Sequence, residues 1–202
     1  KVVFELLDST TYPVYLEDDE GARDYTRDIL KVSGNLHGEL VHILVNHWSS
    51  RREGALETEP KRIAAAETVR EIVEVIRNNE FDPKIIIMGD FNDDPTSKSV
   101  QDYLVKDDFY NPMKKMLDRE KKGSLTYNGK WNLFDQIIFS KNFLEEKEGK
   151  LYFKHAEVFN KDWMKINRGK YKGSPFRTYI GKWYQGGFSD HFPVYAFLKK
   201  KD

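Results

Sequence analysis

The segment at residues 86–95 reads Ile86-Ile87-Met88-Gly89-Asp90-Phe91-Asn92-Asp93-Asp94-Pro95. With Lys84 and Ile85 before it, this segment places a β-branched run, apolar on both faces, directly ahead of acidic and amide side chains. Such a run is too short for a helix and is typical of a central strand covered on both sides. We therefore expect a strand over residues 84–89 in an α/β fold, with polar side chains at its carboxyl end, where such sheets bind ligands.

The same segment offers ligands for a hard cation. Asp90 and Asn92 are two positions apart, so their side chains point the same way if the chain is extended. A carboxylate beside an amide can bind Mg²⁺ or orient a water molecule, because Mg²⁺ prefers oxygen ligands. The alternative is that Asp90, Asp93 and Asp94 only form a turn, since Gly, Asp, Asn and Pro are the usual turn residues. This segment alone leaves both interpretations open.

The elements around this strand mix helices and strands. Apolar side chains recur every three or four positions over residues 60–78 and predict an amphipathic helix. Alternating apolar runs at residues 27–33 and 39–46 flank a turn-rich segment and predict a β-hairpin. We also expect a short helix at residues 97–105 and strands at residues 2–7, 124–127, 134–140, 151–159 and 192–198. This order favours one layered α/β domain over residues 1–202, because no repeat or linker divides it.

Composition limits the class of protein. The 202 residues are 39% hydrophobic, which is enough for one sizeable core. The 33 basic and 33 acidic side chains cancel, so any attraction for a polyanion must be local. The absence of cysteine excludes disulfides and thiolate chemistry and leaves the compartment undetermined. No apolar run approaches the ~20 residues that span a bilayer, so we expect a soluble protein, secreted or periplasmic if a leader has been removed.

Two histidines and an aspartate occupy positions where predicted strands begin or end. Asn46-His47-Trp48 closes the second strand of the hairpin, and Asp190-His191 comes just before the last strand. Asp135 begins an otherwise apolar strand, where a buried carboxylate needs a hydrogen-bond partner such as a histidine ring. Histidine titrates near neutral pH and can act as a general acid or base. Each motif alone also has a structural interpretation, as a surface imidazole or a carboxylate at a turn.

The two other histidines near the hairpin carry no comparable context. His37 lies in the turn-rich segment, and His42 lies within the following strand, away from its exit. We therefore expect these two side chains to have turn and sheet-surface roles, which are the usual places for isolated histidines.

Four motifs in this order resemble the endonuclease/exonuclease/phosphatase superfamily, which includes DNase I-like nucleases. They are Asn46-His47-Trp48, Gly89-Asp90-Phe91-Asn92, Phe134-Asp135-Gln136 and Ser189-Asp190-His191. The resemblance extends over about residues 27–198, and its second and fourth motifs are the most specific. It implies a four-layer α/β sandwich, two packed β-sheets flanked by helices, with the site at one rim of the sheets. It also implies metal-assisted hydrolysis of a phosphate ester.

The resemblance gives roles to the acidic and amide side chains. Asp90 and Asn92 would position the attacking water and the phosphate, and Asp90 and Asp190 would bind the metal ion. That ion would be Mg²⁺, with Mn²⁺ or Ca²⁺ as substitutes. Asn46 would contact the substrate.

The resemblance also gives roles to the histidines. His191 would act as general base or stabilise the phosphate, and Asp135 would orient its ring. His47 would donate a proton or a hydrogen bond to the phosphate from the opposite side. Phosphodiester cleavage needs an activated water, neutralisation of the developing charge and help for the leaving oxygen, and two histidines with a carboxylate-bound cation supply all three.

One part of the family pattern is missing from this sequence. The family also uses an Asn at the end of its first strand and a metal-binding Glu, both before the hairpin that begins near Arg27. Glu5 is the only acid in an early strand, and its Val-Phe-Glu-Leu context differs from that motif. We therefore expect a fold that is incomplete at its N-terminus. Another segment or a complementary chain would supply the missing part, or the fragment would be inactive.

A basic and aromatic segment precedes the last motif. Residues 163–188 contain no acid, and six basic side chains alternate there with aromatic ones. Basic groups neutralise phosphates and aromatic rings stack on bases, so this segment suits nucleic acid. We expect it to form a wall of the substrate site, with Arg177 as the phosphate contact and Trp183 as a further substrate contact. The alternative is a surface loop whose aromatic side chains form a small core of their own.

The sequence therefore predicts a Mg²⁺-dependent phosphodiester hydrolase, with a nuclease favoured by the basic segment. A small-molecule or lipid-headgroup phosphatase of the same superfamily is the second interpretation, because the motifs do not fix the substrate. A catalytically silent binding module that keeps the fold without the metal is the third.

Overall fold

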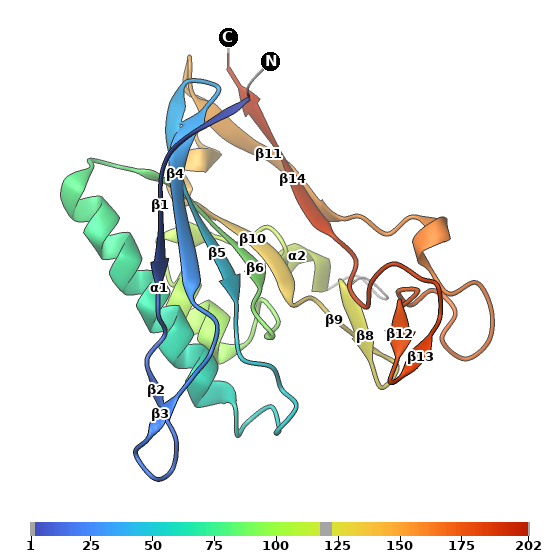
Figure 1. The fold of residues 1–202 in the computed structure, drawn as a ribbon. Helices are drawn as coiled ribbons and strands as arrows, with labels where there is room; N and C mark the ends of the chain where they lie inside the picture. Colours follow the sequence, from blue (N-terminus) through green and yellow to red (C-terminus); the bar gives the residue numbers. More distant parts are fainter. Residues whose placement is uncertain (1–2, 118–122, 202) are drawn as a thin grey trace.

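A six-stranded sheet forms the centre of the computed structural model, which describes residues 3–117 and 123–201 (Figure 1). Its strand order is β1-β4-β5-β6-β10-β7. The strands are β1 (Phe4–Tyr12), β4 (Ile29–Leu36), β5 (Glu39–His47), β6 (Lys84–Asp90), β7 (Phe109–Tyr110) and β10 (Asp135–Ser140). The chain crosses over between β5 and β6, which are parallel, while the other neighbours are antiparallel.

The predicted hairpin is β4 and β5, and its turn has the geometry that a two-residue connection requires. His37 and Gly38 have φ angles of 51° and 81°, which match the left-handed turn that follows the twist of paired strands. The turn role expected for His37 is therefore confirmed. The predicted first strand is also present, but β1 continues past Leu7 to Tyr12 along β4 as an exposed edge. Val2, which the prediction included, lies outside the described residues.

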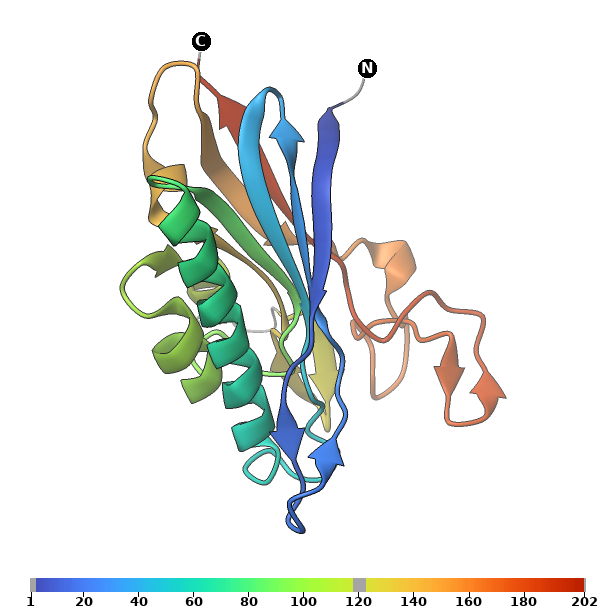
Figure 2. The same cartoon turned by 60° about the vertical axis from the view of Figure 1, so that its left-hand side comes forward.

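Helix α1 (Glu59–Asn79) covers one face of this sheet (Figure 2). Pro60 in its first turn suits the start of a helix, because the nitrogen of proline has no hydrogen to leave unpaired. Its buried stripe packs against Leu44, Ile85 and Ile87 and comprises Arg62, Ala65, Ala66, Val69, Ile72, Val73 and Ile76. Truncating Ile72 to alanine in this core would cost about 2–5 kcal/mol.

A second sheet lies against the other face of the first. It consists of β11 (Leu151–Val158) and β14 (Val194–Lys200), which are antiparallel and lie on the side away from α1 (Figure 1). Buried Phe139 and Phe143 pack there against Leu151, with Ala196 and Leu198 at the edge of the cluster. The expected mixed α/β fold is present as a helix, a six-stranded sheet and a two-stranded sheet, which is less than the four-layer sandwich that the resemblance implied.

Short elements connect these layers. Three small hairpins join β2 (Leu16–Glu17) to β3 (Arg23–Asp24), β8 (Leu125–Tyr127) to β9 (Lys130–Asn132), and β12 (Tyr179–Ile180) to β13 (Trp183–Tyr184). The helix expected at residues 97–105 is a π-helical segment, η1 (Ser99–Val105). The remaining short helical segments are α2 (Lys114–Leu117), η2 (Lys141–Leu144) and η3 (Asp162–Met164). Within the described ranges, no helix combines the length and the apolar character that a membrane crossing needs.

Candidate active site at the rim of the main sheet

Strand register brings the predicted residues to one edge of the main sheet. In the parallel pair β5–β6, His47 lies opposite Asp90, and in the antiparallel pair β10–β6, Asp135 lies opposite Asp90. The carboxyl ends of two strands and the amino end of a third therefore meet at this rim. Gly89 allows the close approach, since a Cβ there would lie 1.9 Å from the carbonyl oxygen of Asn46.

Four polar side chains converge at the rim. Ligand atoms of Asp90, Asp135 and His191 all lie within 4.8 Å of one another. His191 Nδ1 is 2.8 Å from Asp135 Oδ2, and because a carboxylate only accepts, Nδ1 carries the proton of this hydrogen bond. His47 Nε2 is 3.5 Å from Asp90 Oδ2. The two imidazoles thus approach Asp90 and Asp135 from the end of β5 and from the segment before β14.

Electrostatics makes this cluster receptive to positive charge. Burial raises the pKa of Asp90, a hydrogen bond from the Asn92 N–H opposes that rise, and the charge of Asp135 adds to it. Burial alone would lower the pKa of His191, but the hydrogen bond and charge of Asp135, with the charges of Asp90 and Asp190, raise it overall. Two carboxylates so close together favour the imidazolium form of His191 and would attract a cation.

The donor set fits a hard cation through its carboxylates. His191 and Asp135 each use one ligand atom on the other, which is the arrangement of an orienting pair. Asp90 and the second oxygen of Asp135 remain as hard ligands. Mg²⁺ commonly takes one or two carboxylates and fills its other positions with water and phosphate oxygens, and these two side chains match that pattern.

Asp190, predicted as a metal ligand, lies at the edge of this cluster. The residue is exposed, and its charge helps to raise the pKa of His191. Its carboxylate is outside the group of ligand atoms formed by Asp90, Asp135 and His191. The structure therefore places Asp190 near the site but not among the three residues whose ligand atoms lie close together.

Asn92 occupies the turn in a different way from the one expected. Its φ of 50° is left-handed, so the backbone is not extended at Asn92, as the expected shared direction of the Asp90 and Asn92 side chains assumed. The side chain is buried, and its Nδ2 donates to the carbonyl oxygen of Trp48 at 2.9 Å. Its backbone N–H donates to Asp90 Oδ1 at 2.9 Å. Asn92 therefore fixes the carboxylate of Asp90 and joins two rim loops.

Asn46 and His42 also differ from their expected places. Asn46 was expected to contact substrate, but it is buried, with Nδ2 donating to the Leu44 carbonyl and Oδ1 accepting from Trp48 Nε1. Both ends of its amide are used, so it supports the turn after β5. His42 was expected on the sheet surface, yet it is buried between Ser33 and Glu80, 2.8 Å from each. The end of α1 covers this position, which the strand pattern alone did not indicate.

The basic and aromatic segment forms an exposed extension beside the rim. Trp183 on β13 is 77% exposed, and Tyr179, Tyr184, Phe188 and Trp163 are each more than half exposed. Tyr179 contacts Tyr184 and Trp163 contacts Phe188, and with all five rings more than half exposed they do not form a closed core of their own. Gly187 brings the end of the segment against its middle, because a Cβ there would lie 2.1 Å from the Phe176 carbonyl oxygen. Arg177 is half-buried, with Nη2 3.5 Å from the Thr126 carbonyl oxygen.

Three charged residues next to the cluster were not predicted as part of the site. Asp93 is buried in the turn after β6 and pairs with Arg51 and with Arg62. The one local signal was Arg62 itself, a charged residue on the apolar stripe of the helix, where only a buried partner makes it tolerable.

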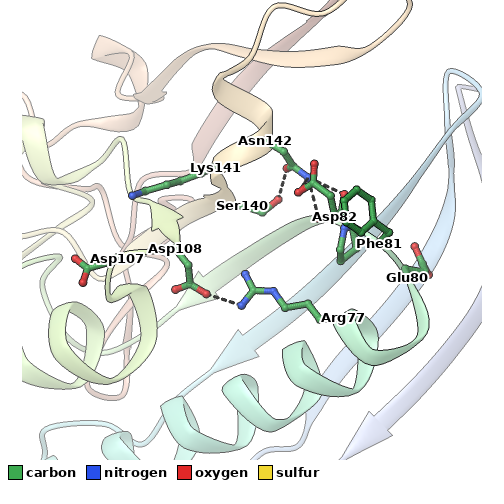
Figure 3. Close-up of a pocket in the computed structure, with 10 residues that line it drawn as sticks. Arg77, Glu80, Phe81, Asp82, Asp107, Asp108, Ser140, Lys141 and Asn142 are labelled. Carbon is green, nitrogen blue, oxygen red and sulfur yellow. Dashed lines mark hydrogen bonds and ion pairs between the residues drawn. The ribbon is translucent and has the colours of Figure 1, made fainter.

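A separate open cavity of about 540 Å³ lies at the opposite end of the main sheet. It lies where β6 begins and β10 ends, and Figure 3 shows Arg77, Asp108, Ser140 and Asn142 around it. None of the rim cluster lines this cavity. The cluster itself is open to solvent, since the His47 side chain is 50% exposed.

Solved structures with this fold are known. C. elegans TDP2 superposes with a TM-score of 0.59 at 16% identity, over 95% of this chain and 65% of that one. D. rerio TDP2, solved with a single-strand DNA product, gives 0.59 at 12% identity, over 98% of this chain and 69% of that one. The Bacteroides thetaiotaomicron mannosyl-6-phosphatase Bt3783 gives 0.56 at 16% identity, over 97% and 67%. The chain thus spans about two-thirds of the length of these solved chains, the first of which is a truncated form of C. elegans TDP2.

Sequence comparison agrees with the fold. No curated protein matches the chain in sequence. The model of the "Endonuclease/Exonuclease/phosphatase family" matches residues 1–200, which is nearly the whole chain. The order of the four motifs, the strand register that brings three of them to one rim and this match agree with one another. The chain belongs to the endonuclease/exonuclease/phosphatase family.

Proposed function

We propose that the rim cluster hydrolyses phosphate esters and that its substrate is a nucleic acid. The observation that carries this proposal is the approach of two imidazoles and two carboxylates within one small, solvent-open region. Those groups match what phosphodiester hydrolysis requires, namely a positioned water, positive charge beside the phosphate and a proton donor for the leaving oxygen. Family membership is consistent with this chemistry.

His191 acts as the cationic partner of the phosphate. Its Nδ1 is held by Asp135, so its Nε2 is the atom left to meet the substrate. Burial alone would lower the pKa of His191, but Asp135, Asp90 and Asp190 raise it overall, so the imidazolium persists to higher pH than in a free histidine. Of the two roles considered for this residue, the structure therefore favours stabilising the phosphate over acting as general base. Asp135 is the residue that orients it.

His47 and Asp90 serve the other side of the reacting phosphate. His47 is half exposed, and its Nε2 reaches toward Asp90, so it can donate a hydrogen bond or a proton to an ester oxygen held between them. Asp90 is fixed by the Asn92 N–H and positions the attacking water. Asp90 and Asp135 would hold Mg²⁺, or Mn²⁺ or Ca²⁺ in its place, with Asp190 as a further carboxylate beside it. When bound, the ion would neutralise charge on the phosphate oxygens.

The exposed aromatic and basic extension supports a polymeric substrate. Trp183 and its neighbours present flat rings to solvent, and residues 163–188 carry basic side chains without an acid. Bases stack on such rings and phosphates pair with such charges, so we assign Arg177 and Trp183 to a single-stranded segment next to the reacting phosphate. D. rerio TDP2, which shares the fold, has been solved with a single-strand DNA product.

A longer assembly would complete the fold. Among the described residues, β14 pairs only with β11, so the second sheet has two strands against six in the first. C. elegans TDP2 extends beyond the region that this chain covers, since the match spans 65% of it. We propose that further polypeptide, in cis or as a complementary chain, completes a four-layer sandwich and supplies the Asn and Glu that this sequence lacks.

Hydrolysis assays test the proposal. The protein is given Mg²⁺ with a single-stranded DNA oligonucleotide and plasmid DNA, and in parallel with mannose 6-phosphate and an inositol phosphate. We expect cleavage of DNA that Asp90→Ala and His191→Ala each reduce by about 10²- to 10⁴-fold. Turnover of the small esters alone would replace the nucleic-acid substrate with a small-molecule one. Activity left intact in both variants would refute the site.

Calorimetry separates an enzyme from a silent binding module. Titration of the wild type with Mg²⁺ is expected to give heat at millimolar metal, and Asp90→Ala is expected to abolish it, because that carboxylate is the central hard ligand. No heat with the wild type, together with salt-sensitive DNA binding, would support the binding module.

A further inference from the structure

Asp93 is a buried carboxylate that lies beside the rim cluster without being able to touch a substrate. Its side chain is only 3% exposed. Oδ1 pairs with Arg51 Nη2, while Oδ2 accepts from Arg62 Nε at 2.7 Å and from Ser99 Oγ. Both oxygens are therefore fully used inside the protein, and any effect of Asp93 on chemistry must pass through its partners.

Arg62 connects this carboxylate to the start of helix α1. Its side chain is 1% exposed, its Nη1 donates to Thr58 Oγ1 and its Nη2 donates to the Ala55 carbonyl, both at 2.6 Å. A buried guanidinium needs all of these acceptors, because an unpaired charge in this environment is strongly destabilising. The pair Arg62–Asp93 thus fixes the turn after β6 relative to α1 and the loop before it.

Arg51 connects the same carboxylate to the loop that follows His47. Its Nε donates to the Asn92 carbonyl oxygen at 2.7 Å, and its guanidinium lies over the Phe134 ring at 4.6 Å. Asn92 has left-handed backbone geometry, which costs energy unless its surroundings hold it. Arg51 is thus placed to hold both Asn92, two residues after Asp90, and the loop that follows His47.

The main chain of Asp93 extends the connection to the third segment of the site. Its carbonyl oxygen accepts from Gln136 Nε2 at 2.7 Å, and Gln136 is the fully buried neighbour of Asp135 on β10. One residue therefore contacts the segments that carry His47, Asp90 and Asp135.

We propose that Asp93 is a positioning residue that sets the spacing between His47 and the Asp90–Asp135–His191 group, acting through Arg51, Arg62 and Gln136. This inference rests on the proposed hydrolytic function of the same site. Holding reacting groups in place lowers the barrier, and a displacement of about 1 Å can cost about 10²-fold in rate. The loss expected on removing Asp93 is therefore a loss in kcat.

The chain offers a matched control in Asp108. This carboxylate also pairs with two arginines, and both lie on α1: Arg70 Nη1 at 2.8 Å and Arg77 Nη1 at 2.6 Å, the latter shown in Figure 3. It lies beside the cavity at the opposite end of the main sheet from the rim cluster. Asp93→Asn and Asp108→Asn therefore remove the same kind of ion pair from the same helix, one near the site and one far from it.

The test compares these two variants and Arg51→Lys in Mg²⁺-dependent cleavage of a single-stranded DNA oligonucleotide, at equal folded fraction. We expect Asp93→Asn to lower kcat about 10²-fold with KM changed less than about threefold, and Asp108→Asn to leave both unchanged. Arg51→Lys, at a position 27% exposed and easier to accommodate, is expected to lower kcat about tenfold. Equal kcat in wild type, Asp93→Asn and Arg51→Lys would overturn the proposal.

A second measurement does not depend on catalysis. Trp48 directly follows His47, and its buried indole N–H donates to Asn46 Oδ1 on β5; the NMR resonance of this N–H can be assigned by comparison with Trp48→Phe. We expect this resonance to shift in Asp93→Asn and Arg51→Lys and to stay in place in Asp108→Asn. If the wild type cleaves nothing, the proposed function fails, and the indole resonance still decides on positioning. An unmoved resonance in both rim variants would refute it.

Discussion

The two ends of the main sheet carry the same kind of ion pair in different surroundings. At the rim, Asp93 and Arg62 are nearly inaccessible, with side chains 3% and 1% exposed. At the far end, Asp108 and Arg77 are 32% and 30% exposed beside an open cavity (Figure 3). The Asp93–Arg62 pair lies next to a cluster of two histidines and two carboxylates. The Asp108–Arg77 pair joins helix α1 to the segment before β7. Burial next to reactive groups, rather than the ion pair itself, is what distinguishes a site from a surface contact.

Of the substitutions at the two ends of the main sheet, Asp90→Ala at the rim is expected to lower activity most. It removes the carboxylate at the centre of the cluster, so we expect DNA cleavage in Mg²⁺ to fall about 10³-fold. Thermal stability should stay level or rise, because burial already makes the ionised form of this group unfavourable and raises its pKa. Circular dichroism melts and initial rates, measured on the same preparations, check both parts. A loss of rate under about tenfold would place the reaction elsewhere.

Asp135→Asn tests the orienting pair and is expected to lower kcat about 10²-fold. The pKa of His191 is raised in the folded protein, against the effect of burial, chiefly by Asp135. The His191–Asp135 pair therefore stabilises the folded state fully at pH values below the ordinary histidine pKa. This stabilisation is lost as the pH rises through the raised pKa of His191. The free energies of unfolding of wild type and Asp135→Asn should differ more at about pH 5.5 than at about pH 8.5. The opposite order, measured by urea unfolding, would contradict the assigned pair.

Trp183→Ala and Arg177→Ala test whether substrate binds beside the rim and not at the far end of the sheet. Each is expected to raise KM for single-stranded DNA about tenfold with little change in kcat, because stacking and phosphate pairing act on binding. The salt dependence of binding should weaken by about one phosphate contact in Arg177→Ala. Phe81→Ala is the matched control, since Phe81 is fully exposed beside the far cavity. An equal change in KM with Phe81→Ala would remove the case for the aromatic extension.

Asp108→Asn is expected to have the smallest effect, on stability alone. Partial burial by itself would raise the pKa of Asp108, but hydrogen bonds from Arg70 and Arg77 lower it overall. A lowered folded pKa gives stability that is present above the unfolded pKa and is lost as pH falls through the folded value. We expect a loss of about 1 kcal/mol near pH 7, since the pair is partly solvated, and no difference below about pH 3. Urea unfolding at the two pH values checks this.

Much of the fold was predictable because its signals are local. The period of apolar residues in α1, the alternation in β4 and β5 and the buried run of β6 each depend on residues within one element. The polar stretch after Leu7 gave no such signal, because β1 is an exposed edge there and buries little. The short hairpins likewise lack the length over which a period can be recognised.

The sequence predicts those site residues whose positions depend on where strands begin and end. His47, Asp90 and Asp135 come together because parallel and antiparallel register places their strand ends at one rim. The burial of Asn46 and the left-handed turn at Asn92 depend on partners in other loops, which sequence order does not reveal. The same holds for Asp93, whose partners lie in two distant segments.

One measurement tests the central claim, that His47, Asp90, Asp135 and His191 surround a single cation and phosphate site. Sub-stoichiometric Mn²⁺ is added to the protein while the ring protons of its five histidines are followed by NMR. Broadening by the paramagnetic ion falls steeply with distance, so we expect His47 and His191 to broaden first. His37, His42 and His155 should stay sharp, and Asp90→Ala should abolish the effect. Equal broadening of all five, or of His37 and His155 ahead of His47 and His191, would contradict the account.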